Sequence, residues 1–279
     1  MSDSIDEFDD LGADFPANTI EVHTDPEQVA EAAAERFVDT IVAAQAARGV
    51  ASVVLTGGSD GIRTLVKVRE NPGDINWGML NVFWGDERYV PADSPERNEL
   101  QAREALLDHV PLDPARVFPM APSDGNFPTV EAAAAAYGQI VLGFLAEAGD
   151  FDLELFGMGP EGHIDSLFPH SPAVRETTEY VVAVHDCPKP PPTRITLTLP
   201  AIHRARHVAL IVTGEGKAAA VAAAVNGASP DDVPAAGAVG IESTTWVIDE
   251  AAASDLGLED FDDFDDEDDE DDEDDTAAK

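Results

Sequence analysis

Four short apolar runs, each ending in a turn of glycines or charged residues, constrain the fold of this chain most strongly. They cover residues 51–55, 80–84, 151–156 and 207–212. Runs of this length that are bounded by turn residues are typical of buried strands, whereas buried helices need longer segments. Segments with helical spacing lie between the runs, and strands that alternate with helices pair in parallel. The sequence therefore predicts an α/β fold, with a mainly parallel open sheet and helices on both faces.

Residues 26–48 form the clearest predicted helix. Apolar side chains recur there at helical spacing, at Val29, Ala33, Phe37 and Ile41. Thr24 or Asp25 is expected to cap its start, and Gly49 to end it. Further helices are expected at residues 62–69, 97–107 and 130–148 and in the Ala-rich segment that ends at 225, and further strands at 180–184, 195–199 and 245–248.

The net charge of −40 is unevenly distributed along the 279 residues. Residues 251–279 carry 16 acidic side chains and one lysine, a net −15, which leaves −25 for residues 1–250. A segment of such dense like charge repels itself and has little apolar surface to bury. We therefore predict an acidic flexible arm at residues 1–18, one α/β domain at residues 19–250 and a disordered acidic tail at residues 251–279. Such a tail either attracts a basic partner or only keeps the chain in solution.

The composition also excludes several kinds of partner and setting. So acidic a body repels nucleic acids and anionic membranes, and no obligate protein partner is indicated. The single cysteine, Cys187, leaves no internal disulfide and suits a reducing compartment. The first residues lack the apolar core of a signal peptide, and no stretch reaches the ~20 apolar residues of a membrane helix. We expect a cytoplasmic protein, and no histidine or cysteine spacing indicates a metal site.

The turn after the third apolar run carries the most reactive residues. His163 stands there with a carboxylate two residues away on each side, Glu161 and Asp165. Residues 157–162 also match G-x-G-x-x-G, the dinucleotide-binding pattern, which needs a long helix after its last glycine. Pro169 follows too soon for such a helix. In open α/β sheets ligands bind at the carboxyl ends of strands, so this turn is the expected reactive centre.

Other turns carry groups that suit an anion. Gly57, Gly58 and Ser59 lie between a strand and a helix, where free backbone N–H groups meet. Arg88, Arg194 and Lys217 lie beside other predicted strand ends. Each has a plain alternative: an ordinary turn, an ion pair of Arg88 with Asp86 or Glu87, or a surface lysine. Together, in so acidic a chain, they indicate a phosphate pocket opposite His163.

A histidine in this setting is a candidate general base, because imidazole titrates near neutral pH. A nearby carboxylate fixes its tautomer and favours its protonated form. The alternative is a structural histidine at the start of a short helix. Ser166 lacks the strained turn of a nucleophilic serine, and Cys187 has no obvious activating neighbour.

Five motifs resemble those of the 6-phosphogluconolactonase family. They are LTGGS from Leu55, WGDERYV from Trp84, GMGPEGHIDSLFP from Gly157, PPPTRITLTLPAI from Pro190 and VTGEGKAAAV from Val212. The motifs follow the family's order and span most of residues 50–221, so the resemblance is specific. It implies a Rossmann-like (NagB/RpiA-type) architecture for the predicted domain.

The resemblance further implies a hydrolase without metal or cofactor that opens the δ-lactone of 6-phosphoglucono-1,5-lactone in the pentose phosphate pathway. By that likeness His163 would activate water, and Glu161 would orient or charge-stabilise the imidazole. The groups implied to hold the 6-phosphate and developing negative charge are Gly57, Gly58, Ser59, Arg88, Arg194 and Lys217. The sugar-phosphate lactone is the one partner implied.

Two departures from the family pattern concern the histidine. Glu161 stands where the family usually has aspartate, and Asp165 replaces a small residue. The second carboxylate would raise the pKa of the histidine. Which of the two carboxylates serves His163 is left open by the sequence.

Two other functions compete with the lactonase. Sugar-phosphate isomerases or deaminases of the glucosamine-6-phosphate type share the glycine turn but carry an acid directly before the proline, where this chain has Phe168. A non-catalytic sugar-phosphate sensor usually accompanies a DNA-binding segment, and the sequence shows none. Both features favour the lactonase.

Overall fold

The computed structural model describes residue 16 and residues 18–257. Most of the predicted acidic arm and the highly charged segment from residue 258 onward therefore lie outside the described residues. The predicted domain boundary at residue 250 falls at the first residue of helix α7 (Glu250–Ala253). This helix buries Ala252 and Ala253 in the same apolar core as Trp246 of the last strand.

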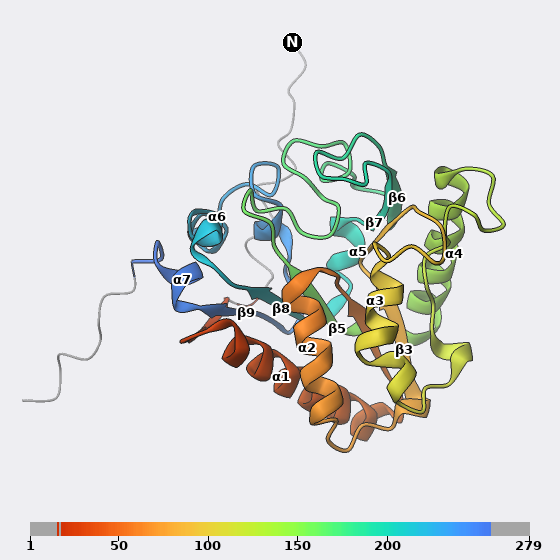
Figure 1. Cartoon of the computed structure of the whole chain (residues 1–279), viewed down its shortest axis with the longest axis horizontal. Coiled ribbons are helices and arrows are strands. Elements are labelled where there is room, and N and C mark those ends of the chain that lie inside the picture. Colours follow the sequence, from red (N-terminus) through yellow and green to blue (C-terminus); the bar gives the residue numbers. More distant parts are fainter. Residues whose placement is uncertain (1–15, 17, 258–279) are drawn as a thin grey trace, which may run out of the picture.

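Six strands form one parallel sheet in the order β1-β9-β8-β5-β2-β3 (Figure 1). Their bounds are β1 Thr19–His23, β2 Ala51–Leu55, β3 Leu80–Trp84, β5 Phe151–Gly157, β8 Ala205–Val212 and β9 Ser243–Asp249. All neighbouring pairs in this sheet run parallel. The predicted mainly parallel sheet is confirmed. Strand β1 was not predicted, because its half-exposed sequence TIEVH lacks an apolar run.

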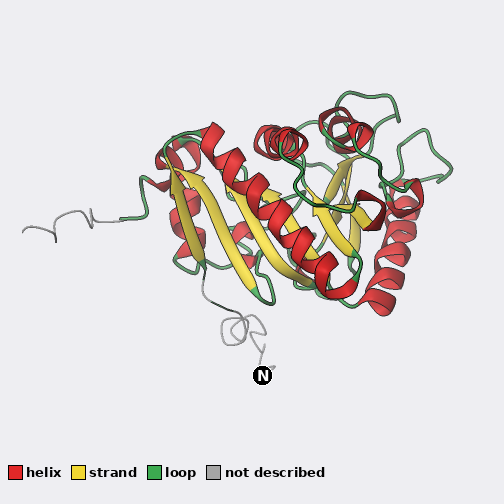
Figure 2. Ribbon diagram, turned by 90° about the horizontal axis from the view of Figure 1, so that it is seen from below, coloured by secondary structure: helices red, strands yellow, loops and turns green. Residues whose placement is uncertain are grey.

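Helices cover both faces of this sheet, as predicted (Figure 2). The longer ones are α1 Pro26–Arg48, α2 Gly58–Glu70, α3 Asn98–Ala105, α4 Val130–Ala148 and α6 Ala218–Val225, and α5 (Leu199–Ile202) is one short turn. Short 3-10 helices are η1 Trp77–Met79, η2 Leu107–His109, η3 Pro114–Arg116, η4 Glu215–Lys217 and η5 Pro234–Gly237. Within residues 16–257, no helix combines the length and apolarity needed to cross a membrane.

Alternating side chains of the central strands build two apolar cores, one on each face. Val53 of β2 packs in the core that contains Phe37 of α1, whereas the next residue, Val54, packs in the core that contains Val141 of α4. Successive residues of a strand point to opposite faces, so a strand buried on both sides is apolar throughout. This explains why the four apolar runs were readable as central strands.

Helix α1 has the bounds and ends that its sequence predicts. The Asp25 carboxylate accepts the backbone N–H groups of Glu27 and Gln28 at 2.8 and 3.0 Å, so Asp25 rather than Thr24 is the cap. Gly49 ends the helix with φ +78°, a left-handed conformation that glycine adopts without steric cost.

A second sheet is antiparallel and was not predicted. It has the order β4-β7-β6, with β4 Asp86–Arg88, β6 Val181–Val184 and β7 Arg194–Leu197. The expected strands at 180–184 and 195–199 exist with shifted ends but belong to this sheet. The chain leaves the main sheet after β3 through Gly85 and enters β4 at once. Strand β4 was missed because its sequence, DER, is entirely charged.

The strand order indicates a ligand-binding crevice at the carboxyl ends of β2 and β5. From β2 the chain moves outward to β3, and later it returns to β5 on the other side of β2. The segments that leave the carboxyl ends of β2 and β5 therefore diverge, and such a switch point is where open α/β sheets bind ligands. The two ends are joined by a 3.2 Å hydrogen bond from the Gly157 N–H to the Thr56 hydroxyl.

Candidate active site

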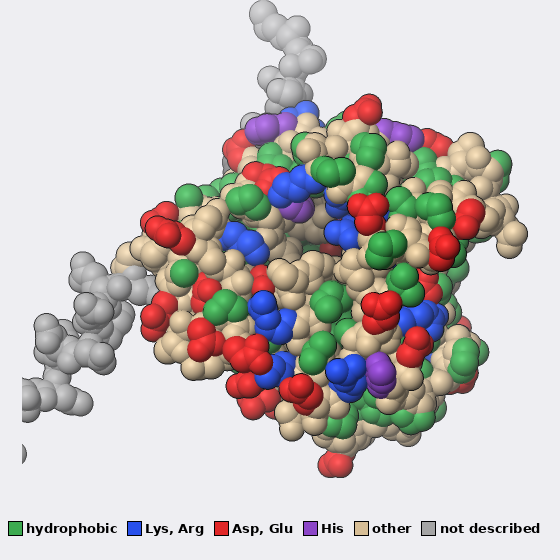
Figure 3. Space-filling view, viewed as in Figure 1, with side chains coloured by type: hydrophobic (Ala, Val, Ile, Leu, Met, Phe, Trp, Pro, Cys, Tyr) green, Lys and Arg blue, Asp and Glu red, His purple; other side chains and the backbone are tan. Residues whose placement is uncertain are grey.

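A cavity of about 210 Å³ opens at the carboxyl ends of β2 and β5. It is lined by Thr56, Gly57, Gly58, Ser59, Asp60, Asp86, Arg88, Asn98, Gly157, Met158, Gly159, His163, Asp165, Arg194 and Lys217. Every residue predicted for the site is among them except Glu161, which contacts His163 from the side. Figure 3 shows a hollow in the middle of one face, with Lys, Arg and His side chains at its rim.

The glycine turn after β2 is the first turn of helix α2. The helix begins at Gly58, four residues before the predicted start, because Gly58 adopts a positive φ of +80° and turns the chain at once into the helix. Gly57 is the cap residue and makes no side-chain cap hydrogen bond. A methyl group on Gly57 would overlap the Asn98 amide, so this close approach requires glycine. The first turn thus meets the cavity as a bare helix N-terminus, which favours an anion.

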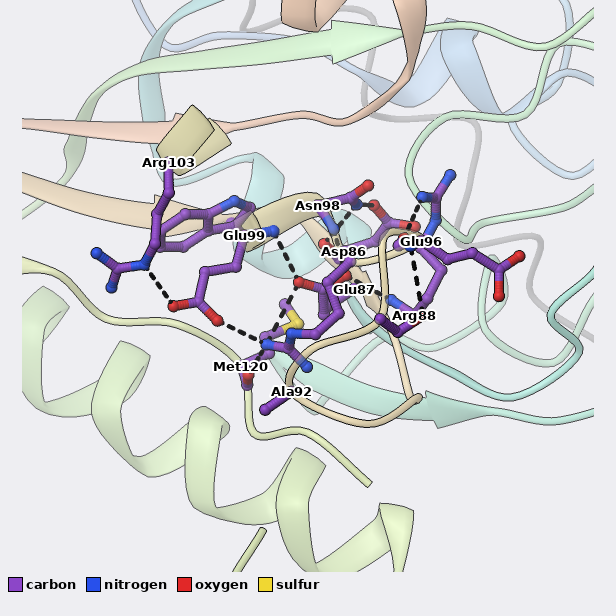
Figure 4. A network of polar contacts seen from close by, with 12 residues as sticks. Asp86, Glu87, Arg88, Ala92, Glu96, Asn98, Glu99, Arg103 and Met120 are labelled. Carbon is purple, nitrogen blue, oxygen red and sulfur yellow. Dashed lines mark hydrogen bonds and ion pairs between the residues drawn. The ribbon is translucent and has the colours of Figure 1, made fainter. Parts of the chain in front are cut away.

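The charged strand β4 serves mainly to hold the cavity wall (Figure 4). The Glu87 carboxylate accepts the N–H groups of Asn98 and Glu99 at 2.7 and 2.9 Å and so caps helix α3. Burial raises the pKa of Glu87 to about 7, against the charge of Arg97 and three backbone N–H groups that lower it. Asp86 accepts a 2.7 Å hydrogen bond from the Asn98 amide. These contacts fix the strand from which Arg88 projects.

Arg88 does not form the internal ion pair with Asp86 or Glu87 that was the alternative prediction. Its Nη1 donates to the Glu96 carbonyl at 2.6 Å, and its Nε has no partner among the described residues. Glu87 pairs instead with Arg97, at 3.5 Å. Arg88 therefore lines the cavity with part of its guanidinium still available to a ligand.

His163 is held by the tight loop that follows β5. The Gly159 N–H donates to the His163 carbonyl at 2.9 Å, and the Gly162 N–H donates to the Gly159 carbonyl at 2.9 Å. A methyl group on Gly159 would overlap the imidazole. No helix follows Gly162, so the dinucleotide-binding interpretation is excluded, as is a helix-start histidine. The ring of Phe168 stacks on the imidazole with centroids 4.4 Å apart.

Glu161, not Asp165, contacts the histidine. Its Oε1 lies 3.2 Å from His163 Nδ1, and its Oε2 accepts a 2.9 Å hydrogen bond from Lys189. Although burial works to raise the pKa of Glu161, the hydrogen bond from Lys189 and the neighbouring charges bring it below its usual value. The pKa of His163 is lowered, first by burial and then by the charge of Lys189, against the raising effect of Glu161. Glu161 does favour the protonated imidazole, as expected, but burial and the charge of Lys189 outweigh it.

Asp165 is buried in the wall of the cavity. It has a positive φ of 46°, is buried, and neither of its carboxyl oxygens has a partner among the described residues. Burial, followed by the charges of Asp86 and Glu154, raises the pKa of Asp165 well above its usual value. Burial therefore favours the protonated form of this carboxyl, and Asp165 is not the carboxylate that pairs with His163.

Two of the predicted cations are tied to protein groups. Lys217 lies 3.3 Å from the carboxylate of Asp60, in the first turn of α2. Arg194 is almost fully buried, and its Nε and Nη2 donate to the three carbonyls of Lys189, Pro190 and Pro191 at 3.0 to 3.3 Å. Arg194 lines the cavity, but its guanidinium mainly holds the proline-rich loop.

Ser166 and Cys187 are not reactive groups here. The Ser166 hydroxyl is buried and donates to the Asp86 carboxylate at 2.7 Å. Cys187 is buried in the apolar core. The one group of possible metal ligands among residues 16–257 is His170, Asp231 and Asp232 at the surface, and Arg175 already occupies both oxygens of Asp231.

Sequence reasoning missed Lys189, Asp86 and Asn98. Lys189 is one of four lysines and lies in the same proline-rich loop that was expected to deliver Arg194. That scarcity was a usable signal. No sequence signal marked Asn98, which reaches the site only because α3 folds back over β4 and Gly57.

Comparisons with known proteins agree with this geometry. Residues 24–246 match the model of the family described as glucosamine-6-phosphate isomerases/6-phosphogluconolactonase. The 6-phosphogluconolactonase of Mycobacterium tuberculosis is 55% identical over 86% of this chain and 99% of its own length. That of Streptomyces coelicolor is 53% identical over 84% of this chain and 93% of its own length.

Solved structures show the same fold. The 6-phosphogluconolactonase of Trypanosoma brucei superposes with a TM-score of 0.74 at 30% identity, over 87% of this chain and 99% of that one. A monomeric glucosamine-6-phosphate deaminase superposes with a TM-score of 0.70 at 21% identity, over 85% of this chain and 99% of that one. The second likeness concerns the fold alone. By its family match and its relatives, this chain belongs to the family of glucosamine-6-phosphate isomerases and 6-phosphogluconolactonases.

Proposed function

We propose that this protein hydrolyses 6-phospho-D-glucono-1,5-lactone to 6-phospho-D-gluconate, in the oxidative pentose phosphate pathway. One observation carries the proposal: a histidine whose Nδ1 faces a carboxylate at 3.2 Å lies in the same cavity as a bare helix N-terminus and three cationic side chains. The relatives named 6-phosphogluconolactonase, at more than 50% identity over most of the chain, support it.

His163 acts as the general base. With Nδ1–H donating to Glu161, the lone pair of Nε2 accepts a proton from water while the water oxygen adds to the lactone carbonyl carbon. The tetrahedral intermediate then collapses: the bond to the ring oxygen breaks, and that oxygen takes the proton from the imidazolium. The product is an open-chain acid with a free hydroxyl. A positioned general base contributes about 10²–10⁴-fold to such a step.

The 6-phosphate is held opposite the imidazole. The first turn of α2, with Gly57, Gly58 and Ser59, offers N–H groups, while Arg88 and Lys217 offer positive charge. Arg194 contributes charge from behind the loop that it holds. Fixing the phosphate aligns the carbonyl with the attacking water, a positioning effect worth several kcal/mol, up to about 7–11 in the best cases.

The isomerase or deaminase function is less well supported. Those reactions need a carboxylate for ring opening beside the histidine, and Phe168 occupies that position and covers the imidazole face. Asp165, the other carboxylate of the loop, is buried in the cavity wall without a partner among the described residues. We also propose that the protein acts in the cytoplasm and binds no nucleic acid.

The test is the hydrolysis rate of 6-phosphogluconolactone made in place by glucose-6-phosphate dehydrogenase. Wild type, His163→Ala and a control, His185→Ala, would be compared with the spontaneous rate. His185 is an exposed histidine paired with Glu131 outside the cavity. We expect acceleration by wild type and the control, and a loss of about 10²-fold or more in His163→Ala.

Each other outcome changes a different part of the proposal. Equal activity in all three proteins would keep the reaction and discard His163 as the base. No acceleration by wild type would reject the lactonase, and a glucosamine-6-phosphate isomerisation assay would follow.

A further inference from the structure

Lys189 reaches the base from a loop far away in the sequence. Its Nζ lies 2.9 Å from Glu161 Oε2 and 3.4 Å from His163 Nδ1, and its side chain is 39% exposed. The lysine therefore joins the carboxylate and the imidazole.

The loop that carries Lys189 is fixed from below. The Arg194 guanidinium restricts the movement of this loop, because it donates hydrogen bonds to the carbonyls of Lys189, Pro190 and Pro191. Arg194 is 4% exposed, begins strand β7, and lies over the ring of Phe168 at 5.9 Å. The backbone of Lys189 is thus attached to the same rigid unit that supports the face of the imidazole.

The contacts of Glu161 show what the ammonium group of Lys189 does beside the imidazole. An ammonium only donates hydrogen bonds, and the nearer acceptor is Glu161 Oε2. This contact leaves Oε1 directed at Nδ1, where it accepts the Nδ1–H and leaves Nε2 unprotonated. A carboxylate without this partner has freedom to rotate at a 34% exposed position.

We propose that Lys189 is a positioning residue for the hydrolysis proposed above: it holds the Glu161 carboxylate aimed at Nδ1 of His163 and places a positive charge beside the imidazole. Lys189 touches no reacting atom in this assignment. It acts only through Glu161 and His163.

The charges that face the imidazole agree with this role. Burial lowers the pKa of His163 most, and Lys189 lowers it further, whereas Glu161 and Asp86 raise it. Without Lys189 the pKa of His163 should rise, so a larger fraction of the base is protonated at mildly acidic pH. The acidic limb of the rate profile then moves to higher pH.

The test compares Lys189→Met, Lys189→Arg and wild type in two measurements. The first is kcat/KM across about pH 5.5–8.5, and the second is the titration of the His163 ring by NMR. We expect Lys189→Met to lose about threefold or more activity near pH 6 beyond its loss near pH 8, and to move the ring titration to higher pH. Lys189→Arg keeps the charge and restores both. Lys67→Met, in α2 outside the cavity, is the control and leaves both unchanged.

The NMR arm separates this inference from the proposed function. If wild type lacks lactonase activity but the ring titration moves in Lys189→Met, the lactonase fails and the control of His163 by Lys189 stands. A ring titration and a rate profile in Lys189→Met that match wild type would overturn the inference. Lys189 is partly exposed, so its replacement leaves no buried cavity, and Lys189→Gln gives a second neutral variant for the same comparison.

Discussion

The two carboxyl groups that flank His163 in sequence have pKa values shifted in opposite directions. On the outer side, Glu161 is partly exposed, paired with Lys189 and the imidazole, and its pKa is lowered. On the inner side, Asp165 is buried without a partner, and its pKa is raised by burial and by the charges of Asp86 and Glu154. Both residues stand two positions from the histidine. The chemistry of each is set by which way the loop turns it, and only the outer carboxylate is available to a base.

The inner side extends into the main sheet. Glu154, in the middle of β5, is fully buried with both oxygens unpartnered among the described residues, and burial raises its pKa to about 8. A neutral carboxylic acid costs far less to bury than a carboxylate. The protein therefore pairs Glu161 on the outer side of the base, whereas burial on the inner side favours the protonated forms of Asp165 and Glu154.

The largest expected effect of this contrast between the two sides is on the pH dependence of the unfolding free energy. The folded-state pKa of Glu154, about 8, lies above its ordinary value of 4.5, so the folded state holds a proton that the unfolded chain has lost. The stabilisation is complete below about pH 4.5 and is lost as the pH rises through 8, with a slope of about 1.4 kcal/mol per pH unit. Urea unfolding at about pH 5, 6, 7 and 8 measures this slope.

Glu154→Gln removes the titrating group. The dependence of unfolding free energy on pH should therefore become shallower by about 1.4 kcal/mol per pH unit, the contribution of one proton. Glu161→Gln, on the outer side, should leave it unchanged between pH 5 and 8. The pKa of Glu161 is lowered, so its small contribution is present above its ordinary pKa and disappears only as the pH falls. A slope in Glu154→Gln equal to that of wild type would show that Glu154 is ionised in the folded protein.

The second effect is on activity. Glu161→Gln replaces the acceptor of Nδ1–H by an amide that can donate to Nδ1 and so favour the wrong tautomer. We expect kcat/KM to fall about 10–100-fold, part of the 10²–10⁴-fold that a general base contributes. Asp165→Asn should change it by less than about threefold, because Glu161 rather than Asp165 pairs with the imidazole and burial favours the protonated form of Asp165. Asparagine also tolerates the positive φ at this position.

This pair of variants can contradict the assignment directly. If Asp165→Asn, with its fold confirmed by circular dichroism, loses more activity than Glu161→Gln, the inner carboxyl takes part in catalysis.

The central strands, the first helix and most of the candidate site could be predicted from the sequence, because local residue patterns mark them. The strands at 51–55 and 80–84 and the helix at 26–48 have the predicted bounds because continuous apolar runs and clear caps mark them. His163 and the residues of the glycine turn were identified because strand ends gather at one edge of a parallel sheet. Pattern and position agree for these residues.

The rest depended on tertiary contacts that no local pattern encodes. Strand β4 consists of charged residues, so only its pairing with β7 makes it a strand. Glu161 and Asp165 have the same spacing from His163, yet Glu161 contacts the imidazole, whereas Asp165 has a positive φ and no partner among the described residues. Lys189 reaches the base across 26 residues of sequence because Arg194 holds its loop.

The third effect uses glycine replacements on the two sides. A methyl group on Gly85 would overlap the buried Asp165 carboxyl, so Gly85→Ala should cost about 1–3 kcal/mol of unfolding free energy. A methyl group on Gly159 would overlap the tips of His163 and Glu161, which can move toward solvent. Gly159→Ala should therefore lower kcat/KM while costing less than about 1 kcal/mol of stability. Urea unfolding and the lactonase assay measure the two quantities.

A matched double variant tests the cause. Gly85→Ala combined with Asp165→Gly removes the overlapping carboxyl and should recover most of the lost stability. Equal losses in the single and double variants would mean that the strain at Gly85 arises elsewhere.

The smallest effect concerns the residue that covers the imidazole, Phe168. Its ring stacks on His163 at 4.4 Å and is 4% exposed, so it keeps water from one face of the base. Phe168→Leu keeps an apolar side chain but loses the flat cover, at a cost of about 0.5–1.5 kcal/mol for the ring contact. Because burial is the largest cause of the lowered pKa of His163, better hydration should raise that pKa. The acidic limb of kcat/KM should then move to higher pH, in the same direction as in Lys189→Met but with Glu161 still held. A limb that moves to lower pH would mean that charge rather than burial controls the base, and the contrast between the two sides would then rest on Lys189 alone.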